Sequence, residues 1–178
     1  MQSEMSDLKR RMTTLEKASR SRNFEIQMLP ERQNENLTVV IKKLFDELKA
    51  QIADNDICAV RRVAKVDTTS KRPRNVLVTL TSERHRDYLL SAYKRYNKAH
   101  KTEPLSSIQL DIPGERRVIY LSEHLAPECK SLHAAARKLA KEREYKFVWV
   151  KYGRVYIRKN ESSPAIVIKD TSSLDKIV

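Results

Sequence analysis

The sequence comprises 178 residues, of which 40% are hydrophobic, and its formal net charge is +13. This length can bury one moderate core or two small ones, and no apolar run approaches the ~20 residues of a membrane-spanning helix. Two cysteines, Cys58 and Cys129, are too few for a disulfide framework, and no secretory leader opens the chain. We therefore expect a soluble intracellular protein of the cytoplasm or nucleus, with no membrane partner.

The positive charge is concentrated in two blocks. Residues 54–101 and residues 113–160 each hold 12 Lys and Arg against 5 Asp and Glu, a net charge of +7 per block, and the remainder carries −1. Such charge attracts phosphate polymers, anionic membrane surfaces or acidic proteins. Because both blocks show the patterns of folded elements, we interpret them as binding surfaces, with generic solubilising charge as the alternative.

The first 22 residues show a short heptad pattern. Apolar residues recur at intervals of four and three, as at the a and d positions of a coiled coil: Met1, Met5, Leu8, Met12 and Leu15. We predict that this segment drives self-association, as a dimer or a trimer, because methionine at these positions specifies the oligomer poorly. The alternative is a single amphipathic helix that packs on its own chain.

Residues 23–121 show elements in the order β-α-β-β-α-β. The predicted strands and helices are 23–29, 37–52, 57–66, 75–80, 82–97 and 117–121, in that order. This is the order of the split βαβ fold, a four-stranded antiparallel sheet backed by two helices, and of RNA-recognition modules. Such modules stack bases on aromatic residues of their first and third strands, but 75–80 contains no aromatic residue. We therefore predict a noncanonical RNA-recognition-like (RRM-like) domain that reads bases poorly through these strands.

Residues 122–178 predict a second, small α/β domain. A helix runs from Pro127 to about Arg143, a hairpin occupies 146–159, and a short strand occupies 165–170. In the hairpin, a turn at Tyr152-Gly153 pairs Lys151 with Arg154. Alternation along the strands then gives a core face of Val148, Val150, Val155 and Ile157 and a second face of aromatic and cationic residues. Burial of those aromatic rings in the core is the alternative interpretation. The predicted fold class is α+β: a short N-terminal coiled-coil helix, a noncanonical RRM-like domain and a small C-terminal α/β domain.

The sequence lacks the motifs of the enzyme classes that we considered, namely a phosphate-binding glycine loop and a complete metal site. A phosphate-cradling loop needs several glycines, and the chain has two, Gly114 and Gly153, far apart. Cys129 and His133 are spaced to share a metal ion on one helix, but a tetrahedral site lacks a fourth ligand nearby. We therefore expect a non-enzymatic protein with no metal and no cofactor.

Cationic and aromatic residues on the two blocks are the candidates for binding nucleic acid. Lysine and arginine neutralise backbone phosphates with little sequence choice, and aromatic rings stack on bases. The first block contributes Arg61, Arg62, Lys71, Arg72 and Arg74. The second block contributes Lys130, Arg137 and Lys141 on one helix side and Trp149, Tyr152, Arg154, Tyr156 and Arg158 in the hairpin, which together predict one wall of a binding cleft.

The order of these segments resembles two related families. After the heptads come "SRNFEIQMLPE", "RRVAKV", "RPRNVLVTL" and "LSEHLAPECKSLHAAARKLAKEREYKFVWVKYGRVYIRKNESS". They resemble the first-open-reading-frame (ORF1) protein of LINE-type retrotransposons and, over the last sixty residues, the baculovirus few-polyhedra (FP) protein. The heptad run is shorter than in these families, and residues 100–114 have no counterpart in them.

The resemblance implies a nucleic-acid chaperone that coats single-stranded RNA or DNA as a coiled-coil oligomer, with the strand between the two domains. It also implies phosphate contacts at nine of the residues named above: Arg61, Arg62, Arg72, Arg74, Arg137, Lys141, Tyr152, Arg154 and Arg158. A rival hypothesis is a structural or assembly protein of a virion or particle, which uses its basic faces on acidic proteins. Binding to anionic membranes is disfavoured, because the cations fall on strands and loops rather than on one amphipathic helix with bulky apolar residues.

Overall fold

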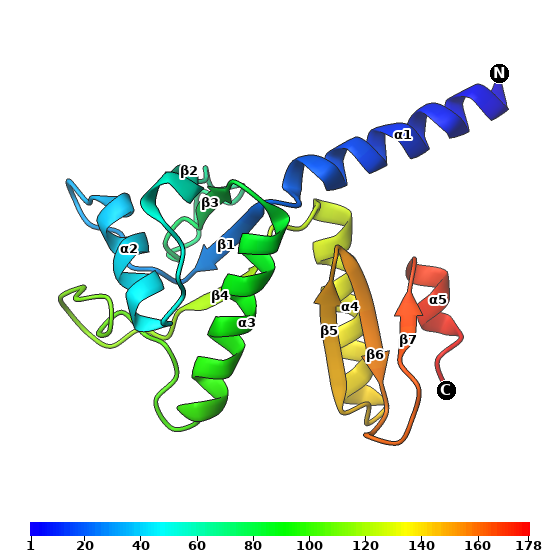
Figure 1. Ribbon diagram of the computed structural model, residues 1–178. Coiled ribbons are helices and arrows are strands. Elements are labelled where there is room, and N and C mark those ends of the chain that lie inside the picture. The colour runs from blue at the N-terminus through cyan, green and yellow to red at the C-terminus, as the bar shows by residue number, and fades with distance from the viewer. The chain divides into compact units, whose positions relative to one another are not determined.

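The computed structural model describes residues 1–178 and has mixed α+β architecture, with an N-terminal helix and two antiparallel sheets (Figure 1). By its internal contacts the chain forms two compact units. One is Ser21–His124, and the other combines Leu125–Val178 with Met1–Arg20. The sequence placed its boundaries after residues 22 and 121. No helix is long and apolar enough to cross a membrane.

Helix α1 (Gln2–Arg20) has no buried residue. Its predicted heptad residues are all exposed, from 58% for Met12 to 97% for Met1. Arg10 and Asp7, one turn apart, form an exposed ion pair of 2.6 Å, which contributes little to stability. The apolar side of α1 is therefore not packed against another part of this chain.

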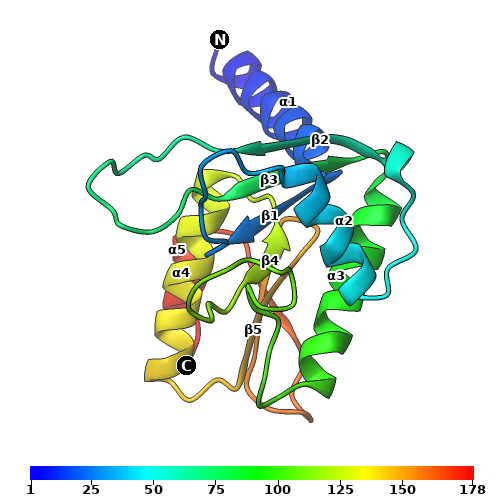
Figure 2. The ribbon, with the colours of Figure 1, turned by 90° about the vertical axis from the view of Figure 1, so that its left-hand side faces the viewer.

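The Ser21–His124 unit is a four-stranded sheet with two helices. Its elements are β1 (Asn23–Gln27), α2 (Leu37–Glu47), a 3₁₀ turn (Asp54–Asp56), β2 (Ile57–Arg62), β3 (Val76–Leu80), α3 (Glu83–Ala99) and β4 (Tyr120–Glu123). The strand order is β2-β3-β1-β4, and every neighbouring pair is antiparallel. Figure 2 shows α2 and α3 side by side on the sheet, where the Tyr96 hydroxyl on α3 donates to Glu47 of α2 at 2.9 Å. Burial and this bond raise the pKa of Tyr96 to about 12.

Alternation along the strands sorts the two faces of this sheet. Phe24 and Ile26 of β1 are fully buried under the helices with Val78 of β3. The intervening residues of β1, Asn23, Glu25 and Gln27, lie on the other face, which we call the open face. The predicted polar and partly acidic character of this face is confirmed on these three residues. Its predicted exposure is wrong at Asn23 and Glu25, which are 8% and 4% exposed, and Leu77 of β3, which pairs with Glu25, is buried as well.

Three predicted elements of this unit have boundaries that differ from the structure by several residues: α2, the fourth strand, and β2, which ends at Arg62 instead of residue 66. Helix α2 ends at Glu47 instead of residue 52, because Lys49 adopts a positive φ of 53°. The Lys49 and Ala50 amides then donate to the carbonyls of Asp46 (3.0 Å) and Phe45 (2.8 Å), a Schellman cap that stops the helix.

The fourth strand is also displaced from its predicted place. It covers 120–123, not 117–121, because Val118 instead forms an isolated bridge with Ser106. The segment before it is well packed, with Leu105, Leu110 and Ile112 buried in the core. The long connection after α3 is therefore part of the folded unit.

The Leu125–Val178 part contains α4 (Pro127–Glu142), β5 (Phe147–Lys151), β6 (Arg154–Arg158), β7 (Ile166–Ile168) and α5 (Thr171–Asp175). Its antiparallel sheet has the order β5-β6-β7, and α4 covers one face of it, behind the hairpin in Figure 1. The predicted pairing of Lys151 with Arg154 is confirmed. Tyr152 and Gly153 have φ of 52° and 66°, as a two-residue type I′ turn requires.

Candidate nucleic-acid interface

The outer face of the β5–β6–β7 sheet, on the side away from α4, carries a row of aromatic and apolar side chains. Trp149 of β5 and Tyr156 of β6 are directly opposed and stack, with ring centroids 5.4 Å apart and planes at 9°. Val167 of β7 continues this row beside Tyr156 and is 37% exposed. Both rings are half-buried, but the helix-facing core is filled by Val155, Ile157 and their neighbours instead. The rings are therefore on a surface of this unit and not in its core.

Cations and a further ring surround one end of this row. Arg154 is exposed beside the turn, and Lys151 places its Nζ 5.3 Å from the centroid of the Tyr152 ring. Tyr152 itself is 54% exposed because the turn projects it beyond the strands. Neither strand of the hairpin contains an acidic residue. This end of the outer face therefore combines positive charge with accessible aromatic surface.

Arg158, at the other end of the hairpin, forms hydrogen bonds with the loop that follows its own strand. Its Nε donates to the Ser163 carbonyl at 2.8 Å, and its Nη2 donates to the Glu161 carbonyl. Nearby, Lys146 forms an ion pair with the Glu161 carboxylate, which lowers the pKa of Glu161. We therefore interpret Arg158 first as the residue that holds the 159–163 loop, and only second as a phosphate contact.

The cations of α4 lie on a different side of the unit. Lys130, Arg137 and Lys141 are exposed, whereas Ala136 and Ala140 of the same helix are buried against the sheet. The sheet thus separates the three cations from its own outer face. The predicted wall that combined both sets is not formed, because period and spacing identify the faces of each element but not the order of the layers.

Arg62 on β2 is a structural residue in this fold. Its Nε and Nη2 donate to the two carboxylate oxygens of Glu35, at 2.8 and 2.9 Å. The remaining bonds go to the carbonyls of Leu29 (2.9 Å), Arg74 (2.7 Å) and Pro30 (3.0 Å). The side chain is 5% exposed, and its bonds lower the pKa of Glu35. No donor of Arg62 is left for a phosphate, so we omit it from the interface.

The loop between β2 and β3 presents the other predicted cations. Lys71 and Arg72 are exposed, and their side chains form no hydrogen bond or ion pair. Arg74 differs, since its guanidinium donates to Glu31 at 3.0 and 3.1 Å and this pairing lowers the pKa of Glu31. Arg61 is exposed on β2, next to the buried Arg62. Of the predicted site cations in this unit, Arg61, Lys71 and Arg72 are therefore available, and Arg74 is partly neutralised.

This loop is ordered by its own hydrogen bonds. The Asp67 carboxylate accepts from the Thr69 amide (2.9 Å) and hydroxyl (2.6 Å), and these bonds lower the pKa of Asp67. Lys65 Nζ donates to the Ser70 carbonyl at 2.7 Å, and the Arg72 amide donates to the Ser70 hydroxyl at 3.3 Å. Lys71 and Arg72 are thus held in position by the backbone around them.

Tyr120 is an exposed aromatic residue that the sequence analysis did not single out. It begins β4, is 50% exposed and pairs with Gln27 of β1. Because its neighbour Leu121 is buried in the core, alternation places Tyr120 on the open face. The signal was present in the predicted strand 117–121, where Tyr120 alternates with Ile119 and Leu121, but stacking residues were sought only in the first and third strands.

The histidine and cysteine residues make other contacts. Cys129 Sγ donates to the Gly153 carbonyl at 3.4 Å, from α4 to the hairpin turn. His133 is half-buried, and burial with the nearby charge of Arg137 lowers its pKa. No three His, Cys, Asp or Glu side chains are arranged to hold a metal ion.

Comparison with known families bears on the C-terminal part. Residues 126–178 match the family model described as Baculovirus FP protein domain 2. The match covers α4, the three-stranded sheet and α5, so the aromatic outer face lies within the matched residues 126–178, which we call the FP domain after this similarity. It supports the resemblance to the baculovirus FP family and leaves residues 1–125 outside it. No curated protein matches the chain.

Proposed function

We propose that this chain is a non-enzymatic protein that binds single-stranded RNA or DNA with weak sequence preference and acts as a nucleic-acid chaperone. The outer face of the FP domain carries this proposal, because Trp149, Tyr152 and Tyr156 lie there with Lys151 and Arg154 and without an acid. Rings stack on any base, and the cations pair with phosphates, which gives affinity without sequence reading.

The Ser21–His124 unit supplies a second surface for the same ligand. Its strand order and its two helices on one face fit an RNA-recognition module, and we infer an RRM-like domain from them. The absence of aromatic residues from β3 and the polar open face make it noncanonical. Its contribution comes from the exposed cations Arg61, Lys71 and Arg72, which suit phosphates better than bases.

The binding of single strands should depend steeply on salt. If six or more phosphates are neutralised, affinity should fall by roughly 10³-fold between 50 and 200 mM salt. Anisotropy titrations of several labelled single-stranded oligonucleotides, and of a duplex, would measure this dependence on the purified chain. Salt-independent or strongly sequence-selective binding would contradict the proposal. Absence of binding to any oligonucleotide would favour the assembly protein with acidic protein partners.

Self-association through α1 completes the proposal, since its apolar heptad residues are exposed along one side. Changing Leu8 and Met12 to Gln should reduce the solution mass to one chain, because both lie in the heptad positions. Sedimentation equilibrium at roughly tens of micromolar, a scale on which weak coiled coils associate, would measure it. The matched control changes Thr13 and Thr14 to Gln, outside the heptad positions, and should keep the oligomer. A monomeric unmodified chain at this concentration would show that α1 is not the association site.

A further inference from the structure

We propose that the Ser21–His124 unit binds one nucleotide of the strand in a pocket at the end of its sheet. The proposal rests on the proposed function and specifies the ligand of a site that the charge pattern alone did not define. The pocket is an open hollow of about 670 Å³, lined by Met28, Pro30, Glu31, Lys65, Ser70, Lys71, Arg72, Pro73 and Arg117. Every one of these residues belongs to the same unit.

The lining has a strong excess of positive charge. Four cations face one acid, and that acid, Glu31, already accepts bonds from the Arg74 backbone (2.5 Å) and guanidinium. The side chains of Lys71 and Arg72 form no hydrogen bond or ion pair, and Arg117 makes one exposed ion pair of 3.3 Å with Glu115, which is weak. The pocket is therefore lined by three cations, Lys71, Arg72 and Arg117, that are available to a negatively charged ligand.

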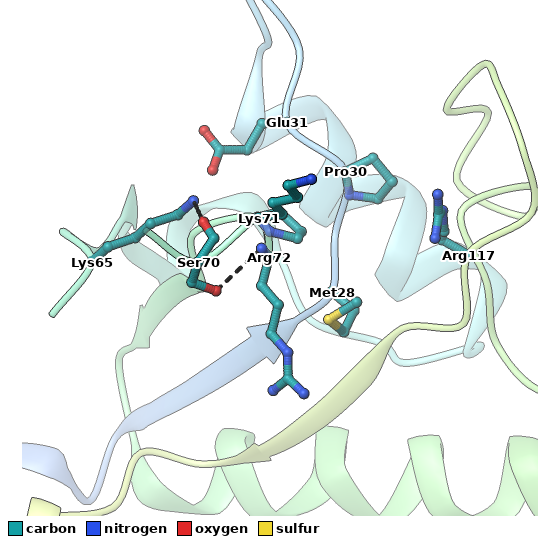
Figure 3. Close-up of a pocket in the computed structure, with 9 residues that line it drawn as sticks. Met28, Pro30, Glu31, Lys65, Ser70, Lys71, Arg72 and Arg117 are labelled. Atoms are coloured by element: carbon teal, nitrogen blue, oxygen red, sulfur yellow. Dashed lines mark hydrogen bonds between the residues drawn. The ribbon is translucent and has the colours of Figure 1, made fainter. Parts of the chain in front are cut away.

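The pocket lining also includes three apolar side chains. They are Met28, Pro30 and Pro73, and Met28 adopts a positive φ of 66° directly after β1. Figure 3 shows Lys65 and Arg117 at the two ends of the pocket, with Lys71, Arg72 and Met28 between them. Cations next to apolar side chains match a phosphate joined to a flat base, whose ring face can lie on apolar side chains, and an inorganic anion would leave the apolar part of the lining without a contact.

The pocket borders the open face of the sheet at Tyr120. Met28 follows Gln27, which pairs with Tyr120, and Arg117 precedes Tyr120 by three residues. The next base of a strand that leaves the pocket can therefore meet the exposed Tyr120 ring. This arrangement favours a nucleotide within a strand as the occupant.

Amide NMR spectra of the full chain, titrated with adenosine monophosphate, test the proposal. Amides of Met28, Ser70 and Arg72 should shift saturably, with a dissociation constant of about 1 mM or tighter. Adenosine alone and inorganic phosphate alone should each bind at least about tenfold more weakly, because each fills half of the site. Equal affinity for phosphate would reduce the site to an anion site and overturn the proposal, as would no saturable shift up to roughly 10 mM.

Matched variants separate this site from general charge. Changing Arg72 and Arg117 to Ala should weaken binding of the nucleotide about tenfold or more, since both contact the phosphate in the proposed mode. Changing Lys94 and Arg95 on α3, which are exposed and outside the pocket, removes the same charge and should have little effect. Equal losses in both pairs would contradict the proposal. A single-stranded oligonucleotide that still shifts β5 and β6 amides, while the nucleotide shifts none, would refute the pocket and leave the proposed function standing.

Discussion

Replacing Arg62 with alanine should lower the free energy of unfolding of the Ser21–His124 unit by about 2–4 kcal/mol. The change leaves the Glu35 carboxylate, with a side chain 14% exposed, without its bidentate partner. It also removes the donors to the carbonyls of Leu29, Pro30 and Arg74, which fix two separate segments around β2. Unpaired buried acceptors and an unpaired carboxylate account for the size of the loss.

The two units allow this loss to be assigned to one of them. Hydrogen exchange of the β1 and β3 amides reports the opening of the Ser21–His124 unit. Trp149, the single tryptophan, lies in the FP domain, so its fluorescence in a urea titration serves as the internal control. We expect faster exchange in β1 and β3 with an unchanged fluorescence transition.

Arg61→Ala is the matched variant. Arg61 is exposed on the same strand, so its removal should change the free energy of unfolding by no more than about 0.5 kcal/mol. It should instead weaken the binding of single strands and reduce the salt slope by about 1. Equal destabilisation by the two variants, or no destabilisation by Arg62→Ala, would contradict the assignment of separate roles.

The sequence alone could have shown that Arg62 faces the core and Arg61 faces solvent. Alternation places Arg62 on the same face as Val60, which packs against the core, and Arg61 on the other face. What the sequence could not show is the partner, because Glu35 is 27 residues away in a connection without periodicity. A cation on a core face is a candidate for an internal ion pair before it is a candidate for a ligand.

Local patterns predicted most elements, because alternation, caps and turn residues act over a few positions. The hairpin register followed from Tyr152-Gly153, and a polar residue at 81 or 82 predicted the start of α3, where the structure has Ser82 as the N-cap, its hydroxyl accepting from the His85 amide at 3.1 Å. The displaced ends have non-local or backbone causes: Lys49 enters the left-handed region, and Val118 pairs with Ser106.

The candidate site was predicted less completely than the fold. Alternation along the hairpin correctly separated its cationic and aromatic residues from its valine and isoleucine residues. Only the valine and isoleucine face packs into the core. The hydrogen bond from Arg158 to the 159–163 loop could not be predicted, because it depends on the course of the loop backbone, which the residue pattern does not determine. The separation of the α4 cations from the hairpin face depends on which face of the sheet the helix covers, which is a tertiary choice.

Tyr152→Asn should lower the affinity of the chain for single strands by roughly 5- to 150-fold, the equivalent of about 1–3 kcal/mol of lost stacking. Asparagine suits the left-handed conformation of this position, where φ is 52°, and Asn-Gly is the preferred sequence of a type I′ turn. The variant therefore removes the exposed ring without destabilising the hairpin. The salt slope should stay nearly unchanged, because no charge is removed.

Arg154→Ala tests the charge at the same end of the hairpin. It should weaken binding to every sequence alike and reduce the salt slope by about 1, since an exposed cation beside the stacking rings is expected to neutralise one phosphate. Lys138→Ala is the control, because this cation is exposed on α4, on the opposite side of the sheet from Arg154. Anisotropy at several salt concentrations gives both quantities for each variant. If Tyr152→Asn and Arg154→Ala bind like the unmodified chain while Lys138→Ala is impaired, the strand follows the helix side of the FP domain and the outer face has another role.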